Sequence, residues 1–400
     1  MEDLLLLIHR IPYPPNKGDK IRSYHLLKHL ARHYHVHLAT FVDDPDDWQY
    51  VPHVEALCAS SHFAGMKPLL ARVRSLQALL KNRSLSLEYY RDASLAGWVD
   101  ATVAKHKIER VLVFSSAMAQ YADPYRSARR VVDFCDVDSD KWRQYAEQKS
   151  WPMNWLYRYE ARQLLAYERR VARDYDASLF VSAPEADLFR QLAPESTAKI
   201  GHFSNGVDTD YFSPEHPHAN PYTPDERALV FTGAMDYWPN VDAVQWFAAD
   251  VFPRLRERFG DVKFYIVGSR PAPAVQELAR LPGVVVTGTV PDVRPYIAHA
   301  AVSVAPLRIA RGIQNKVLEA MAMATPVVVS PQALEGIDAV PGSELVLAED
   351  AGAFVDAVST LLAGQDSAAA AIGAAARAKV QRRYSWSSNL ACIGESLECS

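Results

Sequence analysis

The stretch VSVAPLRIARGIQNKVLEAMAMATPVVVS, residues 302–330, decides the fold class. Its ends, 302–305 and 327–330, are short apolar runs of the kind that form strands buried on both faces. Between them Ile313, Val317 and Met321 recur at helical spacing. A strand, a helix and a strand in direct succession predict a parallel pair joined by a right-handed crossover.

The same alternation extends over the whole chain. The expected strands are 4–8, 36–41, 111–114, 131–134, 177–182, 229–232, 264–267, 284–287, 302–305, 327–330 and 345–348. The expected helices of the second half are approximately 241–259, 274–281, 293–298, 313–324 and 353–362. In the first half, 20–34 has apolar residues at helical spacing, and we expect this face to be buried: Ile21, Tyr24, Leu27, Leu30, Ala31 and Tyr34. The pattern predicts an α/β protein of two doubly wound, Rossmann-like domains.

A proline-rich segment separates the two halves. Prolines 214, 217, 221 and 224 lie among polar residues without periodicity, which is typical of a linker. We expect an N-terminal domain over 1–212, the linker over 213–226, a C-terminal domain over 227–375 and a helical tail over 376–400.

Composition excludes several classes of protein. The net charge of −4 offers no general electrostatic attraction for nucleic acid. The cysteines, Cys58, Cys135, Cys392 and Cys399, are scattered without zinc-site or disulfide spacing, which favours a reducing compartment. No signal peptide or membrane-spanning stretch is evident, so we expect a cytoplasmic protein.

Candidate ligand sites follow the strands, because parallel sheets bind ligands at the carboxyl ends of their strands. Gly18 lies in the loop after the first strand, and Gly233 and Gly268 directly follow strands of the second half. A tight turn is the alternative interpretation of Gly18. No GxGxxG fingerprint is present, which argues against NAD or FAD.

The loop and helix within 306–322 suit a diphosphate. Lys316 lies in the first helical turn, where free amides and the helix dipole favour an anion, and Arg308 and Arg311 precede it. Glu319, one turn further, is placed to accept hydrogen bonds from a ribose. A solvated Lys316–Glu319 pair is the alternative interpretation.

Several motifs together resemble the family 4 glycosyltransferases, which are retaining enzymes of the GT-B fold that use nucleotide sugars. In chain order they are PPNKG (14–18), VS (181–182), NGVD (205–208), FTG (231–233), VG (267–268), GTVPDV (288–293) and KVLEAMAMATPVV (316–328). The segments AMDYWPNVD (234–242) and RGIQNK (311–316) resemble the branch associated with exopolysaccharide synthesis and the PEP-CTERM/exosortase system.

This resemblance implies an acceptor site in the first domain, a nucleotide-sugar site in the second and a cleft between them, with the final helix packing back on the first domain. It implies a retaining, metal-independent enzyme of the hexosyltransferase type that needs no cofactor besides a UDP or GDP sugar. The acceptor would be a glycan or a lipid-linked sugar, with nucleic acid excluded. The implied donor-binding residues are Gly18, Gly233, Gly268, Arg308, Gly312, Asn315, Lys316, Val317 and Glu319.

Glu319 matches the second glutamate of the family's Glu-x7-Glu motif, but Arg311 stands where the first is expected. We therefore expect Arg311 and Lys316 to stabilise the departing diphosphate. Asp136 resembles the aspartate of the family's cleft-facing His-Asp loop, with Cys135 in place of the histidine, and is the candidate base or acceptor-orienting residue.

Two other functions, and two interpretations of one segment, stay open. A sugar-nucleotide epimerase shares the fold, and a two-lobed binding protein for a small ligand shares the architecture. The aromatic and basic segment 142–175 is interpreted either as a helix with a buried aromatic face or as a contact to an anionic inner membrane.

Overall fold

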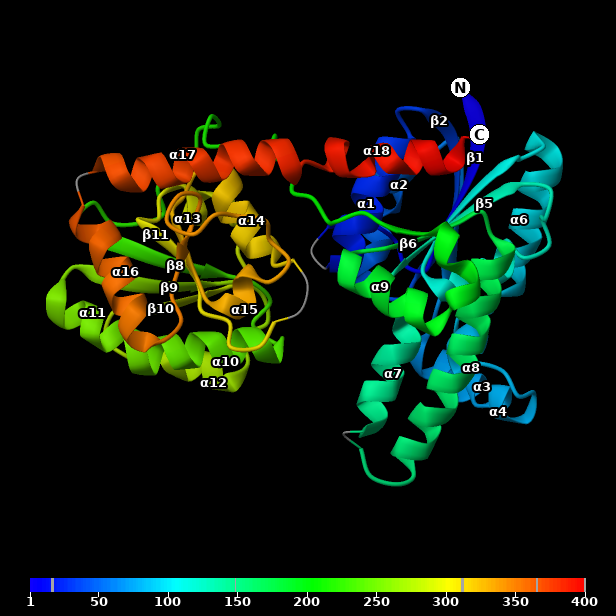
Figure 1. Ribbon diagram of the computed structural model, residues 1–400, viewed down its shortest axis with the longest axis horizontal. Helices are drawn as coiled ribbons and strands as arrows, with labels where there is room; N and C mark the ends of the chain where they lie inside the picture. Colours follow the sequence, from blue (N-terminus) through cyan, green and yellow to red (C-terminus); the bar gives the residue numbers. More distant parts are fainter. Residues whose placement is uncertain (16–17, 148, 311–312, 365, 399–400) are drawn as a thin grey trace. The chain divides into compact units, whose positions relative to one another are not determined.

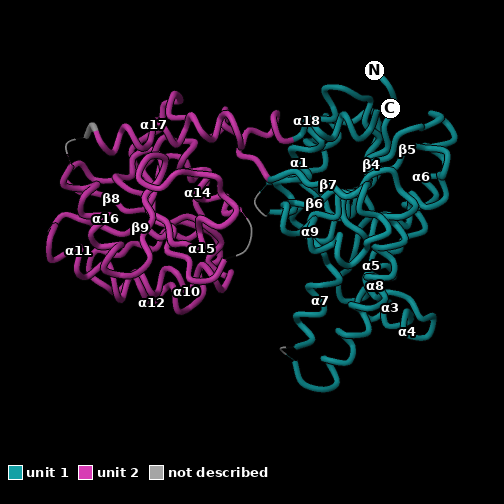
Figure 2. The backbone as a smooth tube through the Cα atoms, viewed as in Figure 1, with its two compact units in different colours: residues 1–204, 390–400 teal, residues 205–389 magenta. Residues whose placement is uncertain are grey.

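The computed structural model describes residues 1–15, 18–147, 149–310, 313–364 and 366–398. It divides into two compact units, shown in different colours in Figure 2. The first contains residues 1–204 together with 390–398, and the second contains 205–389. The proline-rich segment 213–226 is therefore part of the second unit.

The first unit is built on parallel strands that pair in the order β3-β2-β1-β4-β5-β6-β7. The strands are β1 (Glu2–Ile8), β2 (Tyr34–Val42), β3 (Ser60–Gly65), β4 (Arg110–Phe114), β5 (Arg129–Cys135), β6 (Ala177–Phe180) and β7 (Ile200–His202). The helices are α1 (Gly18–Leu30), α2 (Val51–Glu55), α3 (Pro68–Ser75), α4 (Gln77–Leu80), α5 (Leu85–Tyr89), α6 (Ala93–His106), α7 (Asp138–Glu147), α8 (Met153–Asp174) and α9 (Ala183–Leu192). In Figure 1, α1 and α9 lie on one side of this sheet and α6 on the other.

The buried face of α1 differs from the expected one. Arg22 is fully buried, and its guanidinium donates from Nε to Asp133 Oδ2 at 2.7 Å and from Nη2 to Asp133 Oδ1 at 3.1 Å. Ile21 and Tyr24 are only half-buried, and Tyr34 starts β2. Leu27 and Leu30 are buried as expected. In the first turns the expectation is wrong, because the buried position is taken by Arg22, whose carboxylate partner is 111 positions away in the sequence.

The second unit repeats the architecture with the strand order β10-β9-β8-β11-β12-β13. Its strands are β8 (Arg227–Thr232), β9 (Val262–Val267), β10 (Val284–Gly288), β11 (Val302–Ala305), β12 (Val327–Val329) and β13 (Val346–Leu347). Its helices are α10 (Trp238–Trp246), α11 (Phe252–Arg258), α12 (Pro273–Leu278), α13 (Arg294–Ala298), α14 (Asn315–Ala322), α15 (Pro331–Leu334), α16 (Ala351–Ala363) and α17 (Asp366–Arg383). Figure 1 shows α10 and α12 on one side of this sheet and α13, α14 and α17 on the other. The two parallel sheets confirm the predicted α/β class.

The helix expected over 241–259 is divided. A π-helical turn over residues 247–251 separates α10 from α11. Pro253 lies in the first turn of α11, where its missing N–H costs no hydrogen bond. The apolar periodicity of the segment continues through this interruption, so it does not indicate the division.

The last helix, α18 (Trp386–Leu397), enters the first unit from Leu390 onward. Its residues Leu390, Ile393 and Leu397 are buried. Arg110 Nε donates to the Leu397 carbonyl at 3.2 Å and Arg129 Nε to that of Ser396 at 2.7 Å. The end of the chain thus completes the unit in which the chain begins.

Among the described cysteines, Cys58, Cys135 and Cys392 are free thiols. Burial raises the pKa of Cys58 to about 12 and also raises the pKa of the other two thiols. None of the helices within the described ranges is long and apolar enough to cross a bilayer.

Candidate functional site

Three glycine-containing loops meet at the carboxyl edge of the second sheet. Gly233 follows β8, Gly268 follows β9 and Gly288 ends β10, and all three have positive φ. The Gly233 N–H donates to the Val267 carbonyl at 3.1 Å, and the Gly268 N–H to that of Gly288 at 3.3 Å. A Cβ on Gly268 would lie 1.6 Å from the Gly233 carbonyl oxygen. Backbone therefore packs on backbone here, and only glycine fits at position 268.

Lys316 extends from the first turn of α14 toward these loops. Its ammonium donates to Asn240 Oδ1 at 2.8 Å, and Asn240 Nδ2 donates in turn to the Ala234 carbonyl at 2.9 Å. A Cβ on Gly233 would lie 2.7 Å from Asn240 Nδ2 and 3.5 Å from Lys316 Cε. The lysine is thus held beside Gly233 by a buried asparagine of α10. Asn240 was not expected in this role, although its position directly after the Gly233 loop indicates that it is a neighbour of the site.

The environment of Lys316 and Glu319 penalises charge. Burial lowers the pKa of Lys316 to about 8, opposed by the nearby Glu319 carboxylate. Burial also raises the pKa of Glu319 to about 7, opposed by Lys316. A diphosphate beside Lys316 would favour its charged form, and ribose hydroxyls would give the Glu319 carboxylate donors.

The start of α14 has unsatisfied hydrogen-bonding capacity. Asn315 Oδ1 is buried without a hydrogen-bond partner in the structure as described. Gln314, the N-cap residue, makes no side-chain capping bond to the first turn. A buried acceptor and the N–H groups of a first turn together suit a ligand that carries both anionic oxygens and hydroxyl groups.

The other residues expected at the donor site are placed as follows. Arg308 is half-exposed and pairs with Asp242 of α10, with Nε 2.9 Å from Oδ2. Val317 is fully buried in the core, and its N–H donates to the Gln314 carbonyl at 3.0 Å. Gly18 starts α1 in the first unit, with open space where a Cβ would stand. Arg311 and Gly312 lie outside the described residues.

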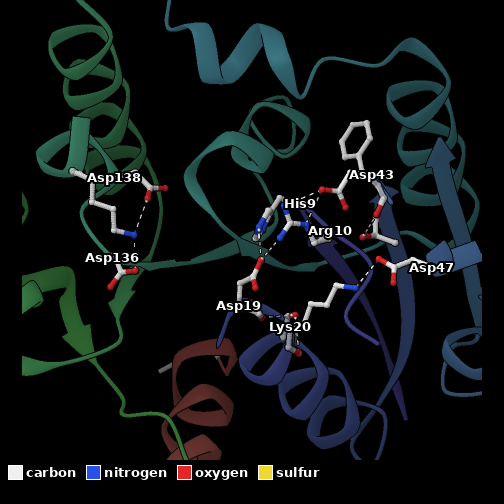
Figure 3. Close-up of polar contacts among 12 residues, drawn as sticks. His9, Arg10, Asp19, Lys20, Asp43, Asp47, Asp136 and Asp138 are labelled. Carbon is white, nitrogen blue, oxygen red and sulfur yellow. Dashed lines mark hydrogen bonds and ion pairs between the residues drawn. The ribbon is translucent and has the colours of Figure 1, made fainter. Parts of the chain in front are cut away.

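In the first unit, Asp136 lies just beyond the carboxyl end of β5, in the loop before α7. Lys141 Nζ is 2.7 Å from Asp136 Oδ2 and 3.3 Å from Asp138 Oδ1 (Figure 3). Burial raises the pKa of Asp138 against the effect of Lys141, and the two carboxylates raise the pKa of Lys141. The preceding Cys135 has φ 66°, so the chain turns sharply and directs Asp136 away from the strand. The carboxylate is half-buried and held by one cation.

A second polar group lies at the same edge of this sheet, after β1. His9 Nε2 is 3.5 Å from Asp19 Oδ2, while its Nδ1 atom is buried and has no partner in the described part of the chain. Arg10 joins Asp19 at 3.0 Å to Asp43 at 2.9 Å (Figure 3). His9 was not among the expected site residues, although a histidine directly after a predicted strand indicates a candidate ligand contact.

One group with potential metal ligands, Asp3, His37 and His106, is found among the described residues. His37 Nε2 lies 2.9 Å from Asp3 Oδ1, and its Nδ1 lies 2.7 Å from Ser60 Oγ. Both ring nitrogens are thus engaged in protein hydrogen bonds, so these contacts account for the group without an ion.

Residues 226–364 match the family model described as Glycosyl transferases group 1. The match contains the glycine loops, Asn240, Lys316 and Glu319. This part of the second unit is thus similar to the group 1 glycosyltransferases. No curated protein matches the chain in sequence.

Solved structures resemble this chain over its whole length. Sucrose-phosphate synthase from Thermosynechococcus elongatus has 18% identity, 99% and 98% of the two chains covered and a TM-score of 0.66. A glycosyltransferase from Rickettsia africae has 14% identity, 100% and 99% covered and a TM-score of 0.65. Anabaena HepE in complex with UDP-glucose has 14% identity, 99% of each chain covered and a TM-score of 0.64. The chain thus has two Rossmann-like units of the GT-B fold.

Proposed function

We propose that the protein is a retaining glycosyltransferase that moves a hexosyl group from a nucleoside-diphosphate sugar, of UDP or GDP type, to a glycan or lipid-linked acceptor. The observation that carries the proposal is the position of Lys316, held by Asn240 beside Gly233 and one turn from Glu319. A neighbouring structure, Anabaena HepE, holds UDP-glucose, which supports a nucleotide sugar as donor.

In the proposed reaction the acceptor hydroxyl oxygen bonds to the anomeric carbon as the bond between that carbon and the diphosphate oxygen breaks, and the hydroxyl proton passes to Asp136 or to the departing diphosphate. Negative charge then grows on the departing diphosphate, so a fixed cation and the N–H groups of α14 stabilise the transition state more than the ground state. Lys316 supplies that charge, and Glu319 holds the ribose. We propose that no metal ion or further cofactor takes part.

Arg308 has a smaller place in this mechanism than the sequence indicates, because Asp242 already neutralises its charge. Arg311, outside the described residues, stays the proposed second cation for the phosphates or for a carboxylate-bearing sugar. We also propose that the sugar-nucleotide donor lies next to Gly312, Asn315 and Val317. Val317 would contact it through the backbone, because its side chain is buried in the core.

The acceptor is proposed to bind the first unit. Asp136 would orient the acceptor hydroxyl or take its proton, and the unpaired Nδ1 of His9 offers a further hydrogen bond at the same sheet edge. We assign the protein to exopolysaccharide synthesis of the PEP-CTERM/exosortase type, in the cytoplasm and at the inner face of the membrane. The motifs 234–242 and 311–316 support this assignment.

The first experiment is thermal unfolding of the full chain with UDP, GDP, ADP, CMP and NAD at equal concentrations. A ligand at about 100 times its Kd stabilises by about 2.7 kcal/mol, so one nucleoside diphosphate should raise the Tm clearly above the others. The protein is then incubated with the sugar nucleotide of the base that raised the Tm, with and without acceptors from a lipid extract. This separates transfer from epimerisation, because an epimerase changes its sugar nucleotide without any acceptor. A flat response to every nucleotide would contradict the proposal.

A further inference from the structure

Helices α3 and α4 of the first unit expose the apolar side of their sequence. The small residues Ala71, Ser75 and Ala78 are buried against the unit. The large residues point outward, with exposed fractions of 75% for Leu69, 64% for Leu70, 69% for Val73, 48% for Leu76 and 91% for Leu80. We call these five side chains the apolar face. A surface helix normally has the opposite arrangement, so this face is suited to an apolar partner.

The segment that carries the apolar face is strongly basic. Residues 67–87 contain Lys67, Arg72, Arg74, Lys81 and Arg83 and no aspartate or glutamate. All five cations are exposed. The whole chain has a net charge of −4, so positive charge is concentrated where the leucines are exposed. This pairing of apolar and basic side chains is complementary to an anionic lipid surface.

A firm attachment to α8 fixes the segment in place. The carboxylate of Glu160, fully buried, accepts from Ser84 Oγ at 2.7 Å, from Ser86 N at 3.0 Å and from Ser86 Oγ at 2.6 Å. Tyr159 Oη donates to the Ala78 carbonyl at 3.3 Å. The apolar face is therefore presented by an ordered part of the unit.

Aromatic side chains continue this surface along α8. Trp155 stacks on Tyr159, with ring centroids 6.0 Å apart, and is 53% exposed. Trp151 and Met153, just before and at the start of α8, are 80% and 40% exposed. Figure 1 shows the α7–α8 hairpin and α3–α4 projecting from the same end of the unit. Exposed tryptophans beside leucines and cations are typical of proteins that bind in the headgroup region.

We propose that the apolar face and its flanking cations insert into the interfacial layer of an anionic membrane, with Trp151 and Trp155 at the headgroup level. The proposal deepens the function above by naming the surface that would bring the enzyme to a lipid-linked acceptor. Only the link to a lipid-linked acceptor depends on the proposed transferase function; the membrane-binding surface itself does not.

The surface charge favours a membrane over a second copy of the chain. Arg83 is paired with Glu88, but Lys67, Arg72, Arg74 and Lys81 make no ion pair within the described residues. A two-fold contact through this face would bring these like charges together. A groove of about 1140 Å³ adjoins the segment and shares Arg74, Lys81 and Arg83 with it. The other two cations of the groove are paired with carboxylates, Arg91 with Glu88 and Arg170 with Asp123. The exposed lysines and arginines of the segment are what would attract anionic headgroups.

The test is sedimentation of the full chain with vesicles of phosphatidylcholine alone or with roughly one third phosphatidylglycerol. We expect binding to the mixed vesicles that weakens with salt, and a drop of about tenfold or more in the double variant Leu69→Gln/Leu80→Gln. The variant Arg72→Gln/Lys81→Gln should lose the preference for phosphatidylglycerol. The control Leu281→Gln/Val340→Gln removes two exposed apolar side chains from the second unit and should bind like the parent.

Equal binding by the leucine variant and the parent, or no binding by the parent, would overturn the proposal. So would light scattering that shows a parent dimer which the leucine variant dissolves, because the face would then join two copies. Nucleotide-induced Tm shifts, measured on the same proteins, report the donor site separately. If vesicle binding fails but the nucleotide still raises the Tm, the proposed transferase function is retained and the membrane surface is rejected. If vesicles bind but no nucleotide raises the Tm, the membrane surface is retained and the transferase function is rejected.

Discussion

The ammonium of Lys316 lies 2.8 Å from Asn240 Oδ1, which joins the first turn of α14 to α10. Asn240 in turn is anchored on the Ala234 carbonyl. The contact positions the cation without neutralising it, because an amide oxygen carries no net charge. The lysine therefore stays available to an anion.

Replacing Lys316 by methionine should weaken nucleoside diphosphate binding by about 10- to 100-fold, the usual cost of losing a charge-assisted hydrogen bond. The lowered pKa of Lys316 means that burial already opposes its charge, so the ligand-free variant should melt at the same or a higher temperature near pH 7. Calorimetric titration and thermal unfolding give both values. Lys105→Met, an exposed lysine of α6, is the control. Unchanged nucleotide affinity in the Lys316 variant would remove the lysine from the site.

Glu319→Gln should separate stability from binding. The pKa of Glu319 is about 7 in the folded chain, against an ordinary value of 4.5. Between pH 4.5 and pH 7, therefore, the carboxyl group is protonated in the folded chain and ionised in the unfolded chain. This stabilising contribution is present below pH 4.5 and is lost as pH rises through 7. We expect the ligand-free variant to gain roughly 2–4 °C in Tm over the parent between about pH 5 and pH 8, while its nucleotide affinity falls. A parallel pH dependence of parent and variant would contradict the role of burial, and Glu335→Gln is an exposed control.

Asp136→Asn should abolish transfer and leave donor binding intact. The carboxylate holds Lys141 at 2.7 Å and is the proposed acceptor residue, so we expect a loss of about 100-fold or more in turnover. Asp187→Asn provides a matched control, because Asp187 is 2.6 Å from Arg190 on the exposed side of α9. Turnover with saturating sugar nucleotide, together with nucleotide affinity, distinguishes the two outcomes. Full activity would place the base elsewhere.

Gly268→Ala should keep the loop after β9 from packing against the Gly233 loop at the proposed donor site. The added Cβ would overlap the Gly233 carbonyl, and relieving the clash costs about 1–3 kcal/mol or more on top of the backbone strain. We expect a Tm lower by several degrees and no nucleotide-induced shift. Gly97→Ala in α6, where the space is open, should instead stabilise by about 0.5–1 kcal/mol. A Gly268→Ala protein that binds nucleotide normally would show that the loops can move apart.

The sequence predicted the parallel strands of both units because buried strands appear as apolar runs between turn residues. It missed β3 and β7, whose sequences SSHFAG and IGH contain polar and small residues in place of an apolar run, and it did not predict the helices α3 to α5. The lysine and glutamate of α14 were found from their place on one helix. Asn240 and His9 were missed as site residues because their roles depend on partners or surroundings brought in from other elements. Periodicity predicts which face of a helix is apolar. It cannot predict that a distant carboxylate, here Asp133, stabilises a buried arginine such as Arg22.

The return of α18 to the first unit has a consequence for synthesis on the ribosome. The strands β1 to β7 emerge early, but Leu390, Ile393 and Leu397, which are buried in the same unit, are made only after residues 205–389. Residues 205–389 are complete before that and have their own core. The second unit is therefore free to finish folding first, which reverses the usual N-terminal-first order, and the first unit waits for residues 390–397 to complete its packing.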